Sequence, residues 1–169
     1  MKIIFLDIDG VLNCKTTKAK CGEYIGIDGP KVKLLRRIVE ETDAIIVMTS
    51  TWKKHWNKRD DFDRYMHRKF GKEHLEIFSC TDGDFYERGY GIHKWIDEHE
   101  VESWVVLDDE IAPDYDDEIL QRLVKTEWYS DDGGLHEEDV PLAIGILNNG
   151  LLIQNTKNDE EVVHVGLAD

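Results

Sequence analysis

The chain has 169 residues, enough for one compact domain with a full hydrophobic core, and no repeat or linker divides it. Charged residues make up 34% of the chain, and the formal net charge of -15 argues against a protein whose whole surface binds polyanions. The three cysteines (Cys14, Cys21 and Cys80) show no CxxC pairing, which argues against a disulfide framework or a zinc site and favours reduced thiols in the cytoplasm.

The N-terminal segment predicts a buried strand over residues 2–6, because KIIFL is a short, continuous run of apolar and β-branched residues. Asp7 and Asp9 interrupt the run, which is therefore too short for a signal-peptide core or a membrane span, and we expect no membrane association. Gly10 allows the chain to turn sharply away from the strand. The polar residues 13–29 then indicate a flap or loop.

A helix is predicted from Pro30 onward, because apolar residues recur after it at helical spacing. Residues 44–48 (AIIVM) predict a second buried strand, which ends at Thr49 and Ser50. The segment 53–72 is mixed helical and holds eight Lys and Arg residues against three Asp, a local charge of +5. Such a run forms either a solvated helix face or a surface for phosphates, and its aromatic residues are either core contacts or platforms for bases.

The second half of the chain continues the alternation of strands and helices. The remaining predicted elements are strand 75–79, helix 91–99, strand 103–107, strand 122–126 and helix 135–148. We expect a single catalytic domain over residues 1–155 with a small helical insert at about 52–87, followed by an acidic C-terminal segment, 156–169.

This alternation predicts a doubly wound, three-layer α/β fold of the Rossmann-like kind, in which a parallel sheet carries helices on both faces. Sheets of this kind bind ligands beyond the carboxyl ends of their strands. Three of the predicted strands end in polar residues: Asp7 and Asp9, Thr49 and Ser50, and Asp108 and Asp109.

The four aspartates are expected to converge at one edge of the sheet if their strands are neighbours. An aspartate at a strand end can also simply cap a turn or a helix. Crowded carboxylates repel one another, however, and burial without a partner is costly for each of them. Oxygen ligands without His or Cys favour Mg²⁺, which readily bridges carboxylates and a phosphate. The sequence therefore predicts a magnesium site and a phosphorylated substrate.

The same residue types are suited to phosphoryl transfer. With the cation bound, one carboxylate can attack phosphorus, and a second one two residues away can protonate the leaving oxygen and then deprotonate water. The hydroxyls of Thr49 and Ser50 and nearby N–H groups can hold the phosphoryl oxygens. A basic residue, Arg88 or Lys94, would complete the clamp.

In the order and spacing of its motifs, the chain resembles the haloacid dehalogenase (HAD) superfamily of phosphohydrolases from residue 2 to about 110, and more loosely to about 150. The motifs are Asp7-Ile8-Asp9-Gly10-Val11-Leu12, then Thr49, then Arg88 or Lys94, then Leu107-Asp108-Asp109.

The resemblance implies a role for each motif. Asp7 would become an aspartyl-phosphate, and Asp9 would be the general acid and base. Mg²⁺ would be bound by Asp7, by the backbone carbonyl of Asp9, by Asp108 directly and by Asp109 through water. The second aspartate of the first motif, which the dehalogenases of the superfamily lack, favours a phosphatase.

The resemblance also orders the remaining candidates. Family spacing favours Arg88 over Lys94 as the basic residue, and we place Thr49 before Ser50 among the hydroxyls. Gly10, Ser50 and Lys94 are the candidates for further substrate contacts.

Three phrases, TSTWKKHW, RGYGIHKWIDEH and VVLDDE, resemble compact HAD-type domains associated with RNA-repair proteins and phage genomes. The intervals 13–43 and 52–87 are too short for a large cap, so the site would be open to a bulky substrate. This implies a nucleic-acid terminal phosphate or a nucleotide as substrate. The basic segment could contact downstream phosphates, and the candidates for stacking on a base are Trp52, Trp56 and Tyr65.

Two other functions are compatible with the sequence. The first is a phosphatase for a sugar phosphate or another small metabolite, against which the lack of a large cap weighs. The second is a non-catalytic interaction module, against which the intact Asp7, Asp9, Thr49 and Asp108 weigh. The sequence does not indicate an oligomeric state.

Overall fold

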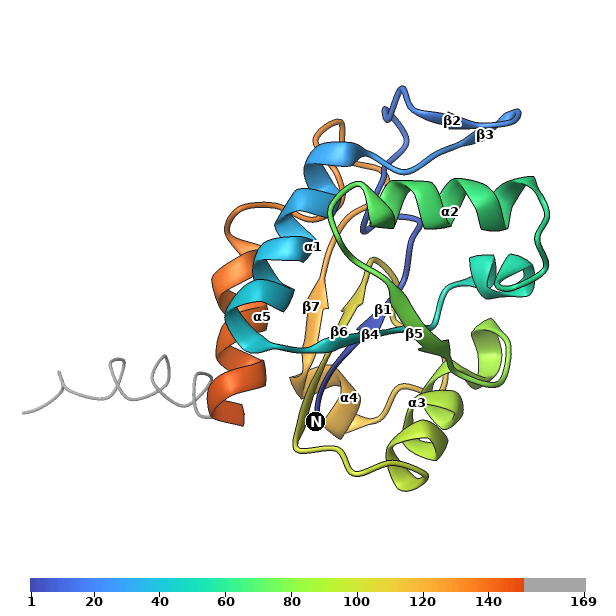
Figure 1. Cartoon of the computed structure of the whole chain (residues 1–169). Coiled ribbons are helices and arrows are strands. Elements are labelled where there is room, and N and C mark those ends of the chain that lie inside the picture. Colours follow the sequence, from blue (N-terminus) through green and yellow to red (C-terminus); the bar gives the residue numbers. More distant parts are fainter. Residues whose placement is uncertain (151–169) are drawn as a thin grey trace, which may run out of the picture.

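A five-stranded parallel sheet forms the centre of the computed structural model, which describes residues 1–150 (Figure 1). The strand order is β5-β4-β1-β6-β7. The strands are β1 (Lys2–Leu6), β4 (Ile45–Met48), β5 (Ile77–Cys80), β6 (Ser103–Asp108) and β7 (Leu123–Lys125). All five were predicted to within two residues, and the doubly wound α/β fold is confirmed.

Helices cover both faces of the sheet (Figure 1). One layer contains α1 (Gly29–Thr42), α2 (Asp61–Gly71) and α5 (Asp139–Asn149), and the other contains α3 (Arg88–Asp97) and α4 (Asp117–Gln121). The alternating side chains of a strand point to opposite faces, so each strand supplies both layers. In β1, Ile4 and Leu6 pack toward the first layer, whereas Ile3 and Phe5 pack toward the second.

Two helices begin at other residues than predicted, because distant groups decide where they start. Helix α3 begins at Arg88 rather than at residue 91, because the carboxylate of Asp114 accepts hydrogen bonds from the N–H groups of Gly89 and Tyr90 at 2.9 and 2.8 Å. Helix α5 begins at Asp139 rather than at residue 135, because the N–H of Leu135 donates to the carbonyl oxygen of Val11 instead.

The polar segment 13–29 is more ordered than a simple loop. It contains a small antiparallel hairpin of β2 (Lys20–Cys21) and β3 (Tyr24–Ile25), with Gly22 at a φ of 61° in the turn. The hairpin is fixed against α2, because the N–H of Ile27 donates to the hydroxyl of Tyr65 at 2.9 Å. Two 3₁₀ turns, η1 (Thr51–His55) and η2 (Phe85–Glu87), complete the described elements.

The ends of the central strands lie at one level. Strand β1 lies between β4 and β6, where the chain changes its direction of travel across the sheet, and this is the place where doubly wound sheets bind ligands. Backbone hydrogen bonds continue past the strand ends, from Asp7 N–H to Leu107 and from Thr49 N–H to Leu6, both at 2.9 Å. The fold therefore brings the ends of three motif-bearing strands together.

Among residues 1–150 no helix is long and apolar enough to cross a membrane. The acidic segment expected at 156–169, and the last residues of the expected domain, 151–155, lie outside the described residues.

Candidate active site

Three aspartates form a compact carboxylate cluster at the carboxyl ends of β1 and β6. One carboxylate oxygen each from Asp7, Asp108 and Asp109 lie within 4.8 Å of one another. Asp7 and Asp108 are buried, and Asp109 is partly exposed. Because all donors are oxygens and they carry an excess of negative charge, the cluster fits a divalent cation such as Mg²⁺.

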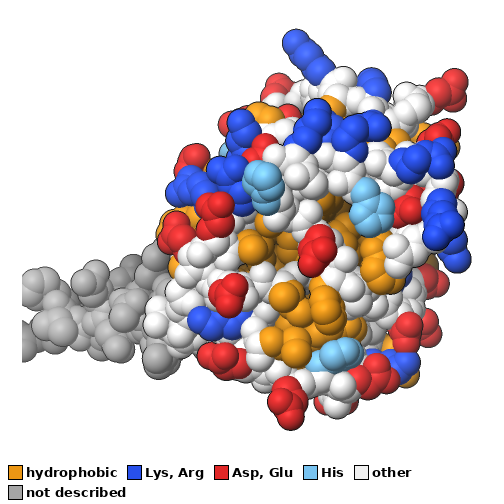
Figure 2. All heavy atoms as spheres, viewed as in Figure 1, with side chains coloured by type: hydrophobic (Ala, Val, Ile, Leu, Met, Phe, Trp, Pro, Cys, Tyr) orange, Lys and Arg blue, Asp and Glu red, His pale blue; other side chains and the backbone are white. Residues whose placement is uncertain are grey.

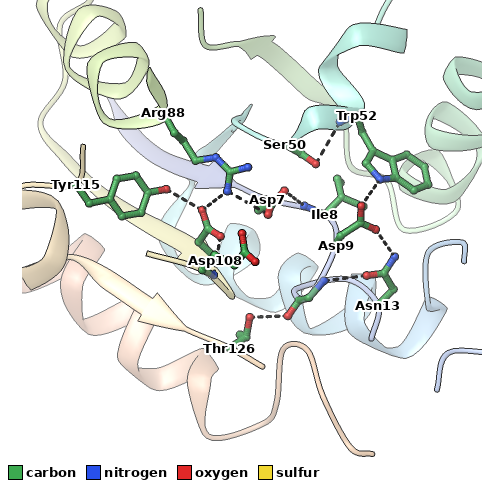
Figure 3. A network of polar contacts seen from close by, with 12 residues as sticks. Asp7, Ile8, Asp9, Asn13, Ser50, Trp52, Arg88, Asp108, Tyr115 and Thr126 are labelled. Atoms are coloured by element: carbon green, nitrogen blue, oxygen red, sulfur yellow. Dashed lines mark hydrogen bonds and ion pairs between the residues drawn. The ribbon is translucent and has the colours of Figure 1, made fainter. Parts of the chain in front are cut away.

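Arg88 reaches this cluster from the first turn of α3 (Figure 3). Its Nη1 atom lies 2.6 Å from Oδ2 of Asp108 and 3.2 Å from Oδ2 of Asp7. The same oxygen of Asp108 accepts a hydrogen bond from the hydroxyl of Tyr115 at 2.7 Å, and the other accepts from the N–H of Glu110 at 3.0 Å. Asp108 is thus held on both sides.

The electrostatics of the cluster show that one arginine does not neutralise it. Burial raises the pKa of Asp7 to about 7, and the charge of Asp108 adds to the rise, while Arg88 and hydrogen bonds from Ser50 and the N–H of Ile8 oppose it. Burial, with the charge of Asp108 next, raises the pKa of Asp109 to about 7 as well. A cation at this place would favour the ionised form of both groups.

Asp9 lies apart from the carboxylate cluster and has its own partners (Figure 3). Its Oδ2 accepts a hydrogen bond from the indole N–H of Trp52 at 2.9 Å, and its Oδ1 accepts from the side-chain amide of Asn13 at 2.8 Å. The oxygen of the same Asn13 amide accepts from the N–H of Gly10 at 2.9 Å. Asn13 therefore fixes both the turn after β1 and the direction of the Asp9 carboxylate.

Only glycine fits at position 10. Its φ is +80°, and a Cβ atom there would lie 2.1 Å from the Cγ of Asp109. Its carbonyl oxygen accepts a hydrogen bond from the Thr126 hydroxyl at 2.5 Å, which ties the turn to the end of β7. Gly10 thus permits the close approach of the first and last acidic motifs.

A cavity of about 350 Å³ opens above the cluster. Its lining includes Asp7, Asp9, Asp109 and Arg88, together with Trp128 from the loop after β7. The candidate nucleophile, the separate carboxylate and the arginine therefore face one space, which is large enough for a phosphate group.

Residues 3–140 match the family model described as the HAD domain in Swiss Army Knife RNA repair proteins. The chain belongs to this family. Membership supports a phosphohydrolase-type function, and it confirms the expected resemblance to HAD domains associated with RNA repair. No curated protein and no solved structure matches the chain significantly.

The structure separates the two candidates for the basic motif of this HAD domain. Arg88 contacts Asp7 and Asp108, whereas Lys94 forms ion pairs with Asp82 and Glu98, and neither pair touches the cluster. The geometry thus favours Arg88 and leaves Lys94 outside the site.

The two candidate hydroxyls differ as well. Thr49 is buried, and its hydroxyl has no hydrogen-bond partner. Ser50 is also buried; it accepts from the N–H of Trp52 at 3.3 Å and lowers the pKa of Asp7 by hydrogen bonding. Both follow the end of β4, and Ser50 is the one that acts on the pKa of Asp7.

Three supporting residues of the HAD site were not predicted: Asn13, Tyr115 and Thr126. Asn13 directly follows the first motif and could have been found from its proximity, because Asn side chains commonly satisfy turn N–H groups. Tyr115 and Thr126 lie in segments without a recognisable motif, and only the packing of the chain brings them to the site.

Proposed function

We propose that this HAD domain is an Mg²⁺-dependent phosphomonoesterase that uses Asp7 as its nucleophile. The observation that supports it most is the position of Asp7, which is buried beside Asp108, Asp109 and Arg88 and borders the open cavity. A carboxylate in this position can approach a phosphate only where positive charge offsets the repulsion between the two anions.

Asp7, Asp108 and Asp109 are the residues that would hold the cation, with the backbone carbonyl of Asp9 as a further candidate ligand. The bound Mg²⁺ would supply charge neutralisation for the nucleophile and for the phosphoryl oxygens. Arg88 supplies a fixed positive charge on the other side of Asp7.

In the first step, a carboxylate oxygen of Asp7 attacks phosphorus, and the bond from phosphorus to the leaving oxygen breaks. Asp9 gives a proton to this leaving oxygen, which departs as an alcohol. The product on the enzyme is an aspartyl-phosphate at Asp7. The hydroxyls of Thr49 and Ser50 are candidates to bind the phosphoryl oxygens.

In the second step, water attacks the aspartyl-phosphate, and Asp9 accepts a proton from it. The bond between Asp7 and phosphorus breaks, so inorganic phosphate is released and the free carboxylate of Asp7 is regenerated. The two N–H donors on Asp9, from Trp52 and Asn13, keep its carboxylate directed for this exchange.

The proposed substrate is a terminal phosphate on a nucleic acid, or a nucleotide. Three observations support it: the family description names RNA repair, the site is open, and Lys54 lines an adjoining cavity. Figure 2 shows Lys and Arg side chains gathered over the region of α2, which contains Arg64, Arg68 and Lys69, on a molecule that is otherwise strongly acidic.

The test is hydrolysis of an aryl phosphate by the parent, by Asp7→Asn and by the control Asp97→Asn. Asp97 is an exposed residue at the last position of α3, at the opposite end of the helix from Arg88 and outside the cavity lining. We expect Mg²⁺-dependent turnover by the parent and the control, and its loss in Asp7→Asn. Turnover that needs no divalent cation and survives Asp7→Asn would contradict the proposed chemistry.

A further inference from the structure

A second cavity, of about 560 Å³, adjoins the cavity above the carboxylate cluster. The two share Asp9, Thr51 and Trp128 in their linings, so a molecule with its phosphate at Asp7 can extend directly into the second space. Five rings line this space, and we call it the aromatic pocket: Tyr24, Trp52, His55, Phe62 and Trp128.

The rings come from separate segments and support one another. Phe62, in the first turn of α2, stacks on His55 at a centroid distance of 4.4 Å and an interplanar angle of 13°. It also makes edge contacts with Tyr24 and Trp52, both at 5.5 Å. Nδ1 of His55 lies 2.7 Å from Oδ2 of Asp60, which fixes the imidazole ring. The pocket therefore has a preformed wall.

One of these rings, Tyr24, is mostly exposed, whereas the other four are buried or half-buried. Tyr24 is 65% exposed at the end of the hairpin, although a tyrosine in the core would be covered. Trp52, in contrast, is buried, and its indole N–H donates a hydrogen bond to Asp9. An exposed ring beside a space lined by other rings has the arrangement expected of a stacking platform.

The charges of the pocket indicate what its occupant carries. Apart from Asp9, its charged or chargeable side chains are Lys54 and His55, both from η1. A flat heteroaromatic ring attached to phosphates fits this combination, because the rings bind its faces and Lys54 attracts its phosphates. A simple sugar would offer no π-face for the five rings.

We propose that the aromatic pocket binds the base of the nucleotide whose phosphate is removed, with Lys54 beside the next phosphate of the strand. This inference rests on the proposed function, since it assumes that the phosphate lies at Asp7. It adds that recognition is by the terminal base and not by the phosphate alone. A free nucleotide shares the contact of the base but has no next phosphate for Lys54, and the test below separates it from a nucleic-acid end.

The test measures binding to Asp7→Asn with Mg²⁺ by isothermal titration calorimetry, so that it does not depend on turnover. The ligands are phosphorylated trinucleotides, with the phosphate at the 3′ or the 5′ end, and the same molecules without the terminal base. We expect the complete end to bind about 5- to 150-fold more tightly than the abasic end, as is typical of one stacked base. Equal affinity would overturn the proposal.

Tyr24→Ala and Tyr90→Ala form a matched pair for the same titration. Both residues are exposed tyrosines, at 65% and 60%, but Tyr90 lines neither cavity. We expect Tyr24→Ala to remove most of the difference between complete and abasic ends, and Tyr90→Ala to retain it. An equal response of the two variants would contradict the assignment of the pocket.

Two further ligands distinguish a free nucleotide from a nucleic-acid end, and both of these from a protein substrate. A nucleoside monophosphate that shows the same dependence on its base, with no gain in affinity from a longer strand, would identify free nucleotides as the ligand. A gain with length would identify nucleic-acid ends. Tighter binding of a phosphotyrosine peptide than of either would overturn the proposal in favour of a protein substrate.

The failure of this inference can be told from failure of the proposed chemistry. If Asp7→Asn does not fold, the same titrations are made on the parent in EDTA. EDTA removes the Mg²⁺ on which the proposed hydrolysis depends, so the ligand is not consumed. Cation-independent turnover in the aryl phosphate assay counts against the chemistry only. Equal affinity for complete and abasic ends counts against the assignment of the pocket only.

Discussion

The carboxylate cluster and the aromatic pocket share a boundary but are built in different ways. The cluster stands on the ends of β1 and β6 at the centre of the sheet, and its aspartates are buried or half-buried. The pocket is formed by a hairpin, a 3₁₀ turn, the start of α2 and a loop, and one of its rings is mostly exposed. The rigid region can align reacting atoms, whereas the peripheral one can differ between relatives and set specificity.

The largest effect is expected at Asp108, which is buried in the carboxylate cluster and is a proposed ligand of the cation. In Asp108→Asn, stabilisation of the protein by Mg²⁺ should disappear; for the parent it is about 2.7 kcal/mol at a free concentration 100 times Kd. Without Mg²⁺ the variant should be less stable than the parent, because an amide accepts hydrogen bonds from Arg88 and Tyr115 less strongly than the buried carboxylate does. Urea unfolding with and without Mg²⁺ measures both. A variant that still gains stability from Mg²⁺ would place the cation elsewhere.

The next effect in size separates Arg88 from Lys94. Arg88→Gln should lower kcat for an aryl phosphate by about 10²–10³-fold, because it removes a buried positive charge at the place of reaction. Lys94→Gln should change kcat by less than about twofold, since exposed ion pairs contribute little. Steady-state kinetics at saturating Mg²⁺ make the comparison, and Arg88→Lys should restore part of the loss. Equal losses in the two glutamine variants would be inconsistent with the geometry.

The sequence predicted the cluster better than the pocket for a physical reason. Buried strands have a clear apolar pattern, and parallel strands end at one edge, so the position of Asp7 relative to Asp108 follows from the fold class. No comparable rule places Tyr24 beside Phe62, because this depends on how a short hairpin packs on a helix. The start of α3 was also misplaced, since its capping group, Asp114, lies in a distant loop.

The sequence also could not decide which of the two candidate hydroxyls acts on Asp7. Thr49 and Ser50 both follow β4, and adjacent residues can point in different directions after a strand ends. The periodicity of the strand cannot decide which one acts on Asp7, and in the structure it is Ser50 that lowers the pKa of Asp7.

A third prediction tests the electrostatics of the cluster through pH. Burial raises the pKa of both Asp7 and Asp109 to about 7, so below this pH the metal-free protein holds protons that Mg²⁺ must displace. These raised pKa values also mean that the metal-free protein loses stability as pH rises from about 4 to 7, and that Mg²⁺ restores it. The affinity for Mg²⁺ should fall by about tenfold per pH unit per displaced proton below pH 7.

Calorimetric titration between pH 5.5 and 8.5 checks this prediction, and heats in buffers of different ionisation enthalpy count the protons released. The aromatic pocket provides the contrast, because stacking of an uncharged base should show no such dependence. An affinity for Mg²⁺ that is constant from pH 8 to 6 would exclude the proposed coupling.

Trp52 belongs to both regions, and Trp52→Phe sharpens the boundary between them. The variant keeps a ring against Phe62 but loses the N–H that orients Asp9, so kcat should fall by about 10-fold or more, as for other groups that orient a functional residue. The loss should be greater for an alkyl phosphate than for a nitrophenyl phosphate, because only the poor leaving group needs a proton from Asp9. Equal losses for both substrates would point to a general disturbance of packing.

The smallest effect is expected at Tyr65, which holds the hairpin and thereby the position of Tyr24. Tyr65→Phe leaves the buried N–H of Ile27 without its partner, so the free energy of unfolding should decrease by about 1–3 kcal/mol. Affinity for a phosphorylated nucleic-acid end should weaken a few-fold, roughly 1 kcal/mol or less by the same hydrogen-bond scale, because the hairpin is less firmly fixed beside the pocket. Affinity for Mg²⁺ should not change, since the hydroxyl that is removed bonds to the backbone of Ile27 and not to the carboxylate cluster. If the affinities for Mg²⁺ and for the nucleic-acid end decreased together, the two regions would be one cooperative unit. The contrast between the carboxylate cluster and the aromatic pocket would then not hold.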